Sequence, residues 1–128
     1  MLGRLCLQLD LASVQVEMDQ ATPCGLIVNE LVSNSLKHGF PAGHSGEVRV
    51  ALGVIADTGQ LQLQVCDTGV GLPPDFEARR GQSLGLQLVS DLASQIDGQL
   101  ELGPRPARGT CFTIVFARDE PPSPAQVA

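Results

Sequence analysis

The segment from Asn29 to His38 (NELVSNSLKH) carries polar side chains at helical spacing within an apolar stretch. Glu30, Asn34 and Lys37 stand at i, i+4 and i+7, which places a carboxylate, an amide and an ammonium group along one side of a helix. A carboxylate can orient a water or a hydroxyl, an amide oxygen is a hard ligand suited to Mg²⁺, and an ammonium group offsets phosphate charge. The set is typical of a metal–nucleotide site, and the same spacing also fits a solvated helix face.

Two glycine-rich loops add binding chemistry. A strand-like run at 61–66 ends in Asp67-Thr-Gly-Val-Gly71, where the glycines let a ligand approach the backbone closely. The Asp67 carboxylate can accept a hydrogen bond from an exocyclic amine such as that of adenine; the alternative is a tight turn with a capping aspartate. The second loop, Gly81-Gln-Ser-Leu-Gly85, leads into a helix whose first N–H groups can bind phosphate oxygens. Both loops therefore favour a nucleotide ligand.

Three common nucleotide-binding signatures are absent. The sequence has no G-x-x-x-x-G-K-[ST], no H-R-D or D-F-G, and no strand–G-x-G-x-x-G–helix unit. P-loop, protein-kinase and Rossmann sites are therefore excluded.

The composition describes one acidic domain. The 128 residues are 43% hydrophobic, which is enough for a single core; we place the domain at 1–118 and a flexible, proline-rich tail at 119–128. A net charge of −6 and four Phe as the only aromatic residues argue against nucleic acid as a partner. Neither a membrane-spanning run nor a secretory signal is visible, so we expect a cytoplasmic domain without direct membrane contact.

The cysteines are expected to be structural. They are far apart in the sequence, form no C-x-x-C pair and mostly lie in apolar strand-like runs. We therefore expect buried, reduced thiols and neither a zinc site nor disulfides. The four residues are Cys6, Cys24, Cys66 and Cys111.

Alternation of apolar and polar residues predicts the strands. Half-buried strands joined by a short turn are expected at 5–9 and 14–18, and further strands at 47–54, 61–66, 99–102 and 110–116. Pro23 is expected to open a helix to about His38, and Ser83 to N-cap a second helix to about Ile96. The set predicts a two-layer α/β (α+β) sandwich: a mixed, mostly antiparallel sheet with the helices on one face.

Four segments, taken in order, resemble the N, G1, G2 and terminal glycine boxes of the GHKL ATPases: Asn29 to His38, Asp67 to Gly71, Ser83 to Val89 and Gly109 to Phe112. The similarity is greatest to the catalytic ATP-binding (HATPase) domains of bacterial sensor histidine kinases, in particular the subgroup related to the HWE kinases, and it covers about residues 5–117. The resemblance implies the Bergerat ATP-binding fold, which holds ATP between the N-box helix and a lid, here about residues 72–82.

The resemblance also implies roles for individual residues. Asn34 would ligate Mg²⁺, Lys37 and His38 would approach the phosphates, and Asp67 would bind the adenine amine. Glu30 is a candidate base, at a position where the commonest histidine kinases carry Asn and the ATP-hydrolysing relatives carry Glu. The remaining pocket residues would be Gly69, Gly71, Ser83, Leu84, Gly85 and Leu86, with Thr110 near the Asp67 end.

The implied function is that of an ATP-dependent protein histidine kinase domain. It would hold MgATP and donate the γ-phosphoryl group to a His on a separate dimerisation and phosphoacceptor domain of the same kinase, with a response regulator as an indirect partner. The alternative within the same fold is a stand-alone serine kinase of the anti-sigma-factor type. Two other hypotheses are a dimeric aspartic protease built on Asp67-Thr-Gly69, which leaves Asn34 and Lys37 without a role, and a nucleotide-sensing module that transfers nothing.

Overall fold

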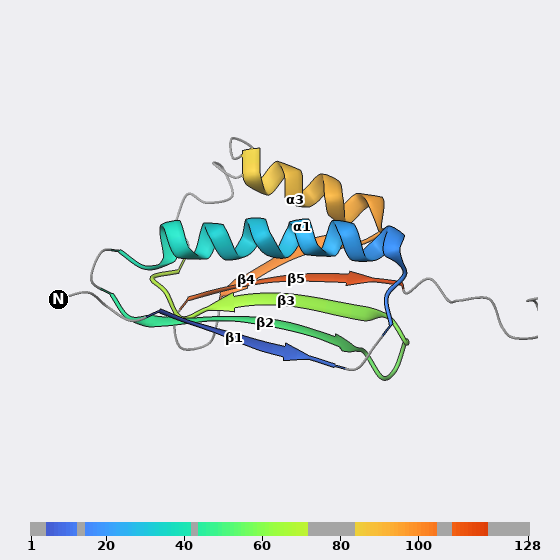
Figure 1. The fold of residues 1–128 in the computed structure, drawn as a ribbon, viewed down its shortest axis with the longest axis horizontal. Coiled ribbons are helices and arrows are strands. Elements are labelled where there is room, and N and C mark those ends of the chain that lie inside the picture. The colour runs from blue at the N-terminus through green and yellow to red at the C-terminus, as the bar shows by residue number, and fades with distance from the viewer. Residues whose placement is uncertain (1–4, 13–14, 42–43, 72–83, 105–108, 118–128) are drawn as a thin grey trace, which may run out of the picture.

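The computed structural model describes residues 5–12, 15–41, 44–71, 84–104 and 109–117 (Figure 1). In chain order the elements are β1 (Leu5–Leu11), α1 (Met18–Asn34), the π-helical turn η1 (Ser35–Gly39), β2 (Gly46–Val54), β3 (Leu61–Asp67), α3 (Leu84–Gln95), β4 (Gln99–Pro104) and β5 (Thr110–Phe116). The strands of these residues form one sheet in the order β1-β2-β3-β5-β4. β1 pairs with β2 in parallel and the other pairs are antiparallel, so the predicted mixed, mostly antiparallel sheet is confirmed.

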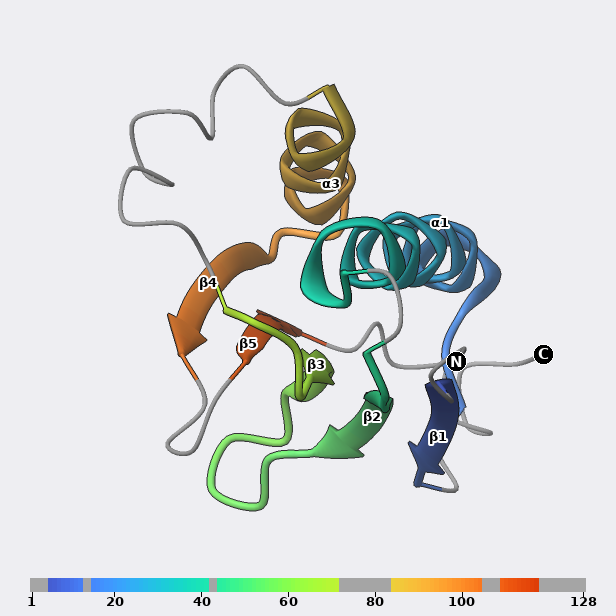
Figure 2. The ribbon, with the colours of Figure 1, turned by 90° about the vertical axis from the view of Figure 1, so that its left-hand side faces the viewer.

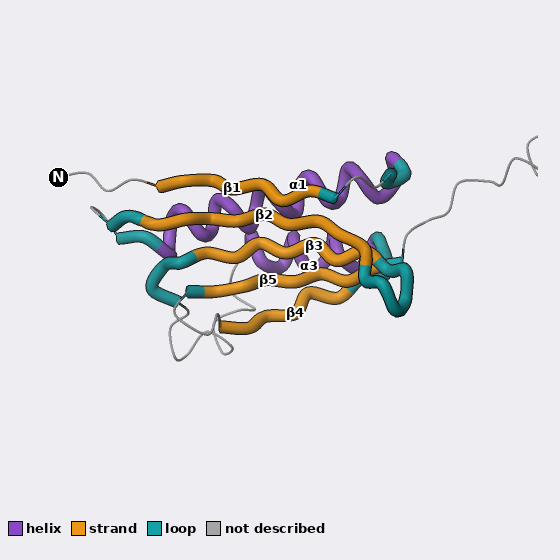
Figure 3. Tube along the Cα trace, turned by 90° about the horizontal axis from the view of Figure 1, so that it is seen from below, coloured by secondary structure: helices purple, strands orange, loops and turns teal. Residues whose placement is uncertain are grey.

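Both long helices lie on one face of the sheet (Figure 2). Seen from the other side, the sheet lies in front of them and is not covered by a helix of the described residues (Figure 3). β3 and β5 each alternate strictly between buried and half-buried residues, because successive side chains of a strand point to opposite faces. The predicted two-layer sandwich is confirmed. Its core is formed by residues that include Ile27, Leu31, Val48, Leu61, Val65, Val89, Ile114 and Phe116.

Helix α1 begins earlier than the sequence predicts. It begins at Met18, five residues before Pro23, and the residues described between 15 and 17 are not in a strand, so both the strand predicted at 14–18 and the helix start at Pro23 are wrong. Val16 packs against the core, and the buried Gln20 side chain donates a hydrogen bond to the carbonyl of Ala117 (2.7 Å). These contacts anchor the first turn, and such tertiary contacts override a local pattern.

Strand β1 forms where it is predicted, but it is not half-buried. Its register places Leu7 and Leu9 beside Val48 and Val50 of β2, which face the helices. β1 lies at the edge of the sheet (Figure 2), and Leu9 remains 60% exposed whereas Val50 of the next strand is 3% exposed. Because β1 and β2 run parallel, the chain connects them by a crossover through α1 and not by the predicted short turn of a hairpin.

The second predicted helix agrees with α3. Its end is closed by Asp97, which has a φ of +55°, and by the backbone N–H of Gly98, which donates to the carbonyl of Ala93 (2.8 Å). Ser83, the lid at 72–82 and the tail at 119–128 lie outside the described residues. Within the described part of the chain, none of the helices is long and apolar enough to cross a membrane.

Candidate nucleotide-binding site

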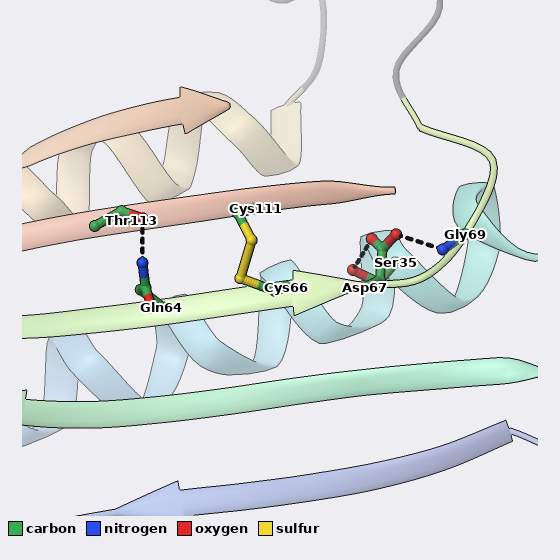
Figure 4. The surroundings of a disulfide bond; sticks show 7 residues. All are labelled: Ser35, Gln64, Cys66, Asp67, Gly69, Cys111 and Thr113. Carbon is green, nitrogen blue, oxygen red and sulfur yellow. Dashed lines mark hydrogen bonds between the residues drawn. A yellow bond between two sulfur atoms is a disulfide. The ribbon is translucent and has the colours of Figure 1, made fainter. Parts of the chain in front are cut away.

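A buried carboxylate stands at the end of the central strand. Asp67 is the last residue of β3, faces the helices and is only 4% exposed. The Ser35 hydroxyl donates to Oδ2 (3.0 Å) and the backbone N–H of Gly69 donates to Oδ1 (2.9 Å), as Figure 4 shows. An ionised carboxylate has about four acceptor positions, so the one donor that the described residues place on each oxygen leaves capacity for a further donor.

Three backbone segments come very close together around Asp67. A Cβ on Gly69 would lie 2.3 Å from the carbonyl oxygen of Gly39, and one on Gly109 would lie 2.0 Å from the carbonyl oxygen of Asp67. Gly109 also has a φ of +104°, which an L side chain rarely adopts. The backbone N–H of Val70 donates to the carbonyl of Gly39 (2.8 Å). The end of η1, the loop after β3 and the start of β5 thus enclose the carboxylate.

Thr110 lies directly across from Asp67. The two residues are opposed in the antiparallel register of β3 and β5, and Thr110 is also 4% exposed. Gly71, another predicted pocket residue, has a φ of +83°, and a Cβ there would lie 3.6 Å from the carbonyl oxygen of Gly109. The structure therefore brings the residues of the first and last glycine boxes together at one end of the sheet.

A second group of predicted residues lies where α1 meets α3. A Cβ on Gly85 would lie 2.9 Å from Oε2 of Glu30 and 3.7–3.8 Å from the amide atoms of Asn34. Glu30 and Asn34 are both half-buried on the shared face that the sequence predicts. In the first turn of α3, Leu86 is buried whereas Leu84 is 84% exposed. Glycine at position 85 therefore lets a carboxylate and an amide oxygen face the start of α3.

Lys37 and His38 belong to η1 and not to the regular α-helix. Both side chains are exposed, and the π-helical turn changes the angular spacing that an unbroken α-helix would give between Asn34 and Lys37. Single π-turns often occur at functional sites. The same turn carries Ser35 and Gly39, so η1 connects the Asn34 group with the Asp67 group.

Sequence reasoning missed Ser35 and Gly39 as site residues. Ser35 hydrogen-bonds Asp67, and a Cβ on Gly39 would lie 3.5 Å from Oδ1 of the same carboxylate. The available signal in the sequence is that Ser35 lies inside the N-box segment and that Gly39 directly follows it. Nothing in the local pattern pairs Ser35 with a residue 32 positions away.

The expectation of four reduced, buried cysteines is wrong. Cys66 and Cys111 form a disulfide with a Cα–Cα distance of 4.1 Å (Figure 4), because they are directly opposed in the register of β3 and β5. Cys6 is exposed on the edge strand β1. Cys24 is half-buried and reduced, and burial raises the pKa of its thiol.

The fold and this arrangement of residues match a known family. The family model for histidine kinase-, DNA gyrase B- and HSP90-like ATPases matches residues 19–120. The chain belongs to this family. Among its members, this ATPase domain corresponds to the catalytic ATP-binding domain of two-component sensor histidine kinases. The protease interpretation of Asp67-Thr-Gly69 is therefore wrong.

Individual relatives are sensor kinases for the most part. The sensor histidine kinase PdtaS of Mycobacterium tuberculosis is 37% identical over 97 residues, which are 74% of this chain and 19% of the relative. The solved histidine kinase domain of the EL346 blue-light activated histidine kinase of Erythrobacter litoralis superposes with a TM-score of 0.78 at 29% identity, over 89% of this chain and 55% of that one. An anti-sigma F factor of Geobacillus kaustophilus is 36% identical over 69 residues, 54% of this chain and 46% of the relative. The chain thus spans about a fifth of the length of PdtaS.

Proposed function

We propose that this domain binds MgATP and donates the γ-phosphoryl group to a histidine on a separate phosphoacceptor domain of the same kinase. The observation that carries the proposal is the buried Asp67 carboxylate, which has one fixed donor on each oxygen and acceptor capacity left for an amine. ATP presents such an amine on adenine, whereas GTP presents a keto oxygen at the same place. The site should therefore select adenine.

The second group of residues suits the phosphate end of the ligand. The half-buried amide oxygen of Asn34 is a hard ligand of the kind Mg²⁺ prefers, and the exposed Lys37 and His38 follow it on η1. A bound Mg²⁺ would neutralise negative charge on the β- and γ-phosphates. Asn34 would hold the ion, and Lys37 and His38 would orient the phosphates.

Glu30 is the proposed base of the site. Its carboxylate faces the first turn of α3 beside Asn34, since both lie near the position of a Cβ on Gly85. A carboxylate there can orient an attacking group and accept its proton. Positioning and charge neutralisation would supply the rest of the catalysis.

The phosphoacceptor should lie on another domain. His38 belongs to the constrained turn η1, and His44 lies outside the helices between η1 and β2, so neither stands on a helix that could carry an acceptor imidazole into line with the γ-phosphate. We therefore propose the acceptor domain as the direct partner and a response regulator as the indirect one. Because the domain uses ATP, we propose that it lies in the cytoplasm. We also propose residues 1–118 as the functional unit.

Incubation with γ-labelled ATP tests the proposal. The 128-residue chain alone should hydrolyse ATP slowly and acquire no acid-labile phosphate, and addition of an acceptor domain in trans should produce acid-labile, base-stable label on that domain. Robust acid-labile label on this chain alone would contradict the assignment of the acceptor. Acid-stable label on a serine of a protein partner would instead favour the anti-sigma-factor type of kinase, to which the Geobacillus relative points.

A further inference from the structure

We propose that Cys66 and Cys111 form a reversible disulfide that couples the cellular thiol redox state to nucleotide affinity at the Asp67 end of the site. This inference rests on the proposed binding of ATP. In this proposal a bond on the uncovered face of the sheet regulates a site on the face that the helices cover.

The two cysteines adjoin the two most buried polar residues of the site. Cys66 immediately precedes Asp67 on β3, and Cys111 immediately follows Thr110 on β5. Asp67 and Thr110 face the helices and are each 4% exposed, whereas the side chains of Cys66 and Cys111 point to the uncovered face and are half-buried (Figure 4). The disulfide therefore spans the rung of the ladder next to the one that carries the carboxylate.

The disulfide lies where it can restrain the strand ends that carry the site. Asp67 and Thr110 form the last rung of the β3–β5 ladder, and β3 continues beyond it into the loop that contains Gly69. In the dithiol form this end is held only by noncovalent contacts, among them backbone hydrogen bonds and the bonds of Asp67 to Ser35 and Gly69, and the ends of strands open with low free energy. A covalent link one rung inside the end suppresses such opening, so it holds the Asp67 carboxylate against its partners Ser35 and Gly69.

The chemistry is an ordinary thiol–disulfide exchange. Because both cysteines are only half-buried and lie on the face that no described helix covers, one of them can attack a small-molecule disulfide such as glutathione disulfide and release one glutathione. The second cysteine then attacks the mixed disulfide, releases the second glutathione and closes the Cys66–Cys111 bond. The two thiol protons and two electrons pass from the protein to the two glutathione molecules. In a cytoplasmic protein such a bond is typically transient and redox-sensing.

ATP titration of the chain in both redox states tests the coupling. A Cys6→Ser/Cys24→Ala background leaves only this cysteine pair, and mass spectrometry verifies that glutathione disulfide closes it and dithiothreitol opens it. We expect the oxidised form to bind ATP about five-fold or more tightly than the reduced form, at the lower end of usual coupling strengths. By linkage, saturating MgATP should shift the oxidised fraction in glutathione buffers by the same factor.

The control replaces both cysteines of the pair by serine in the same background. This variant should bind ATP like the reduced form and ignore the redox buffer, with circular dichroism verifying its fold. The coupling is overturned if the disulfide does not form, if both redox states bind ATP equally, or if the serine variant binds like the oxidised form. Absence of ATP binding in both states of a folded chain would instead overturn the proposed function, and the coupling with it.

Discussion

The substitution Asp67→Asn separates the charge of the carboxylate from its shape. The backbone N–H of Gly69 is a fixed donor, so the new amide oxygen must face it, and the amide NH₂ group then faces Ser35, whose hydroxyl can rotate to accept. The fold should therefore lose only about 1 kcal/mol, the usual value of one hydrogen bond. The ligand amine loses a charge-assisted bond worth about 2 kcal/mol, which corresponds to roughly 30-fold weaker binding of ATP.

Isothermal titration of wild type and variant with ATP and GTP measures both effects. The NH₂ group of the asparagine can donate to the keto oxygen of guanine, so the preference for ATP over GTP should also fall. Asp57→Asn is the matched control, since Asp57 is exposed in the turn before β3, at the opposite end of that strand. Equal ATP affinity of wild type and a folded Asp67→Asn variant would refute the adenine assignment.

Three further predictions test other parts of the domain. Asn34→Ala should abolish the Mg²⁺ enhancement of nucleotide binding and leave metal-free binding nearly unchanged. Asn29→Ala, at an exposed position of the same helix, should change neither. If calorimetry with and without Mg²⁺ shows an intact enhancement for Asn34→Ala, Asn34 is not the ligand. Gly109→Ala should cost at least about 2 kcal/mol in denaturant unfolding because of its positive φ and its contact with a strand carbonyl, whereas Gly53→Ala, with nothing within 4 Å of its Cβ, should cost less than about 1 kcal/mol. Because burial raises the pKa of the Cys24 thiol, its thiolate forms only at higher pH, so iodoacetamide at pH near 7.5 should label the exposed cysteine of β1 first; equal labelling rates by mass spectrometry would contradict this.

The sequence alone determined the elements whose signals are local. Strand β3 alternates without interruption, so its start and its buried face followed from the period of two residues, and the structure adds one residue to its predicted end. The acid at the end of that strand and the glycines beyond it pointed to Asp67 as a candidate site residue. The helical spacing of Glu30 and Asn34 likewise placed both on one face, and the structure brings that face to the start of α3.

Tertiary structure decided everything that depends on neighbours distant in the sequence. Val16 packs against the core and Gln20 hydrogen-bonds the backbone just after β5. These contacts let α1 begin at Met18, earlier in the sequence than predicted. The same register that opposes Asp67 to Thr110 also opposes Cys66 to Cys111 across 45 positions, and no local pattern encodes such a register. Exposure of the β1 leucines has the same origin, because alternation reports which side chains share a face but not whether a helix covers that face.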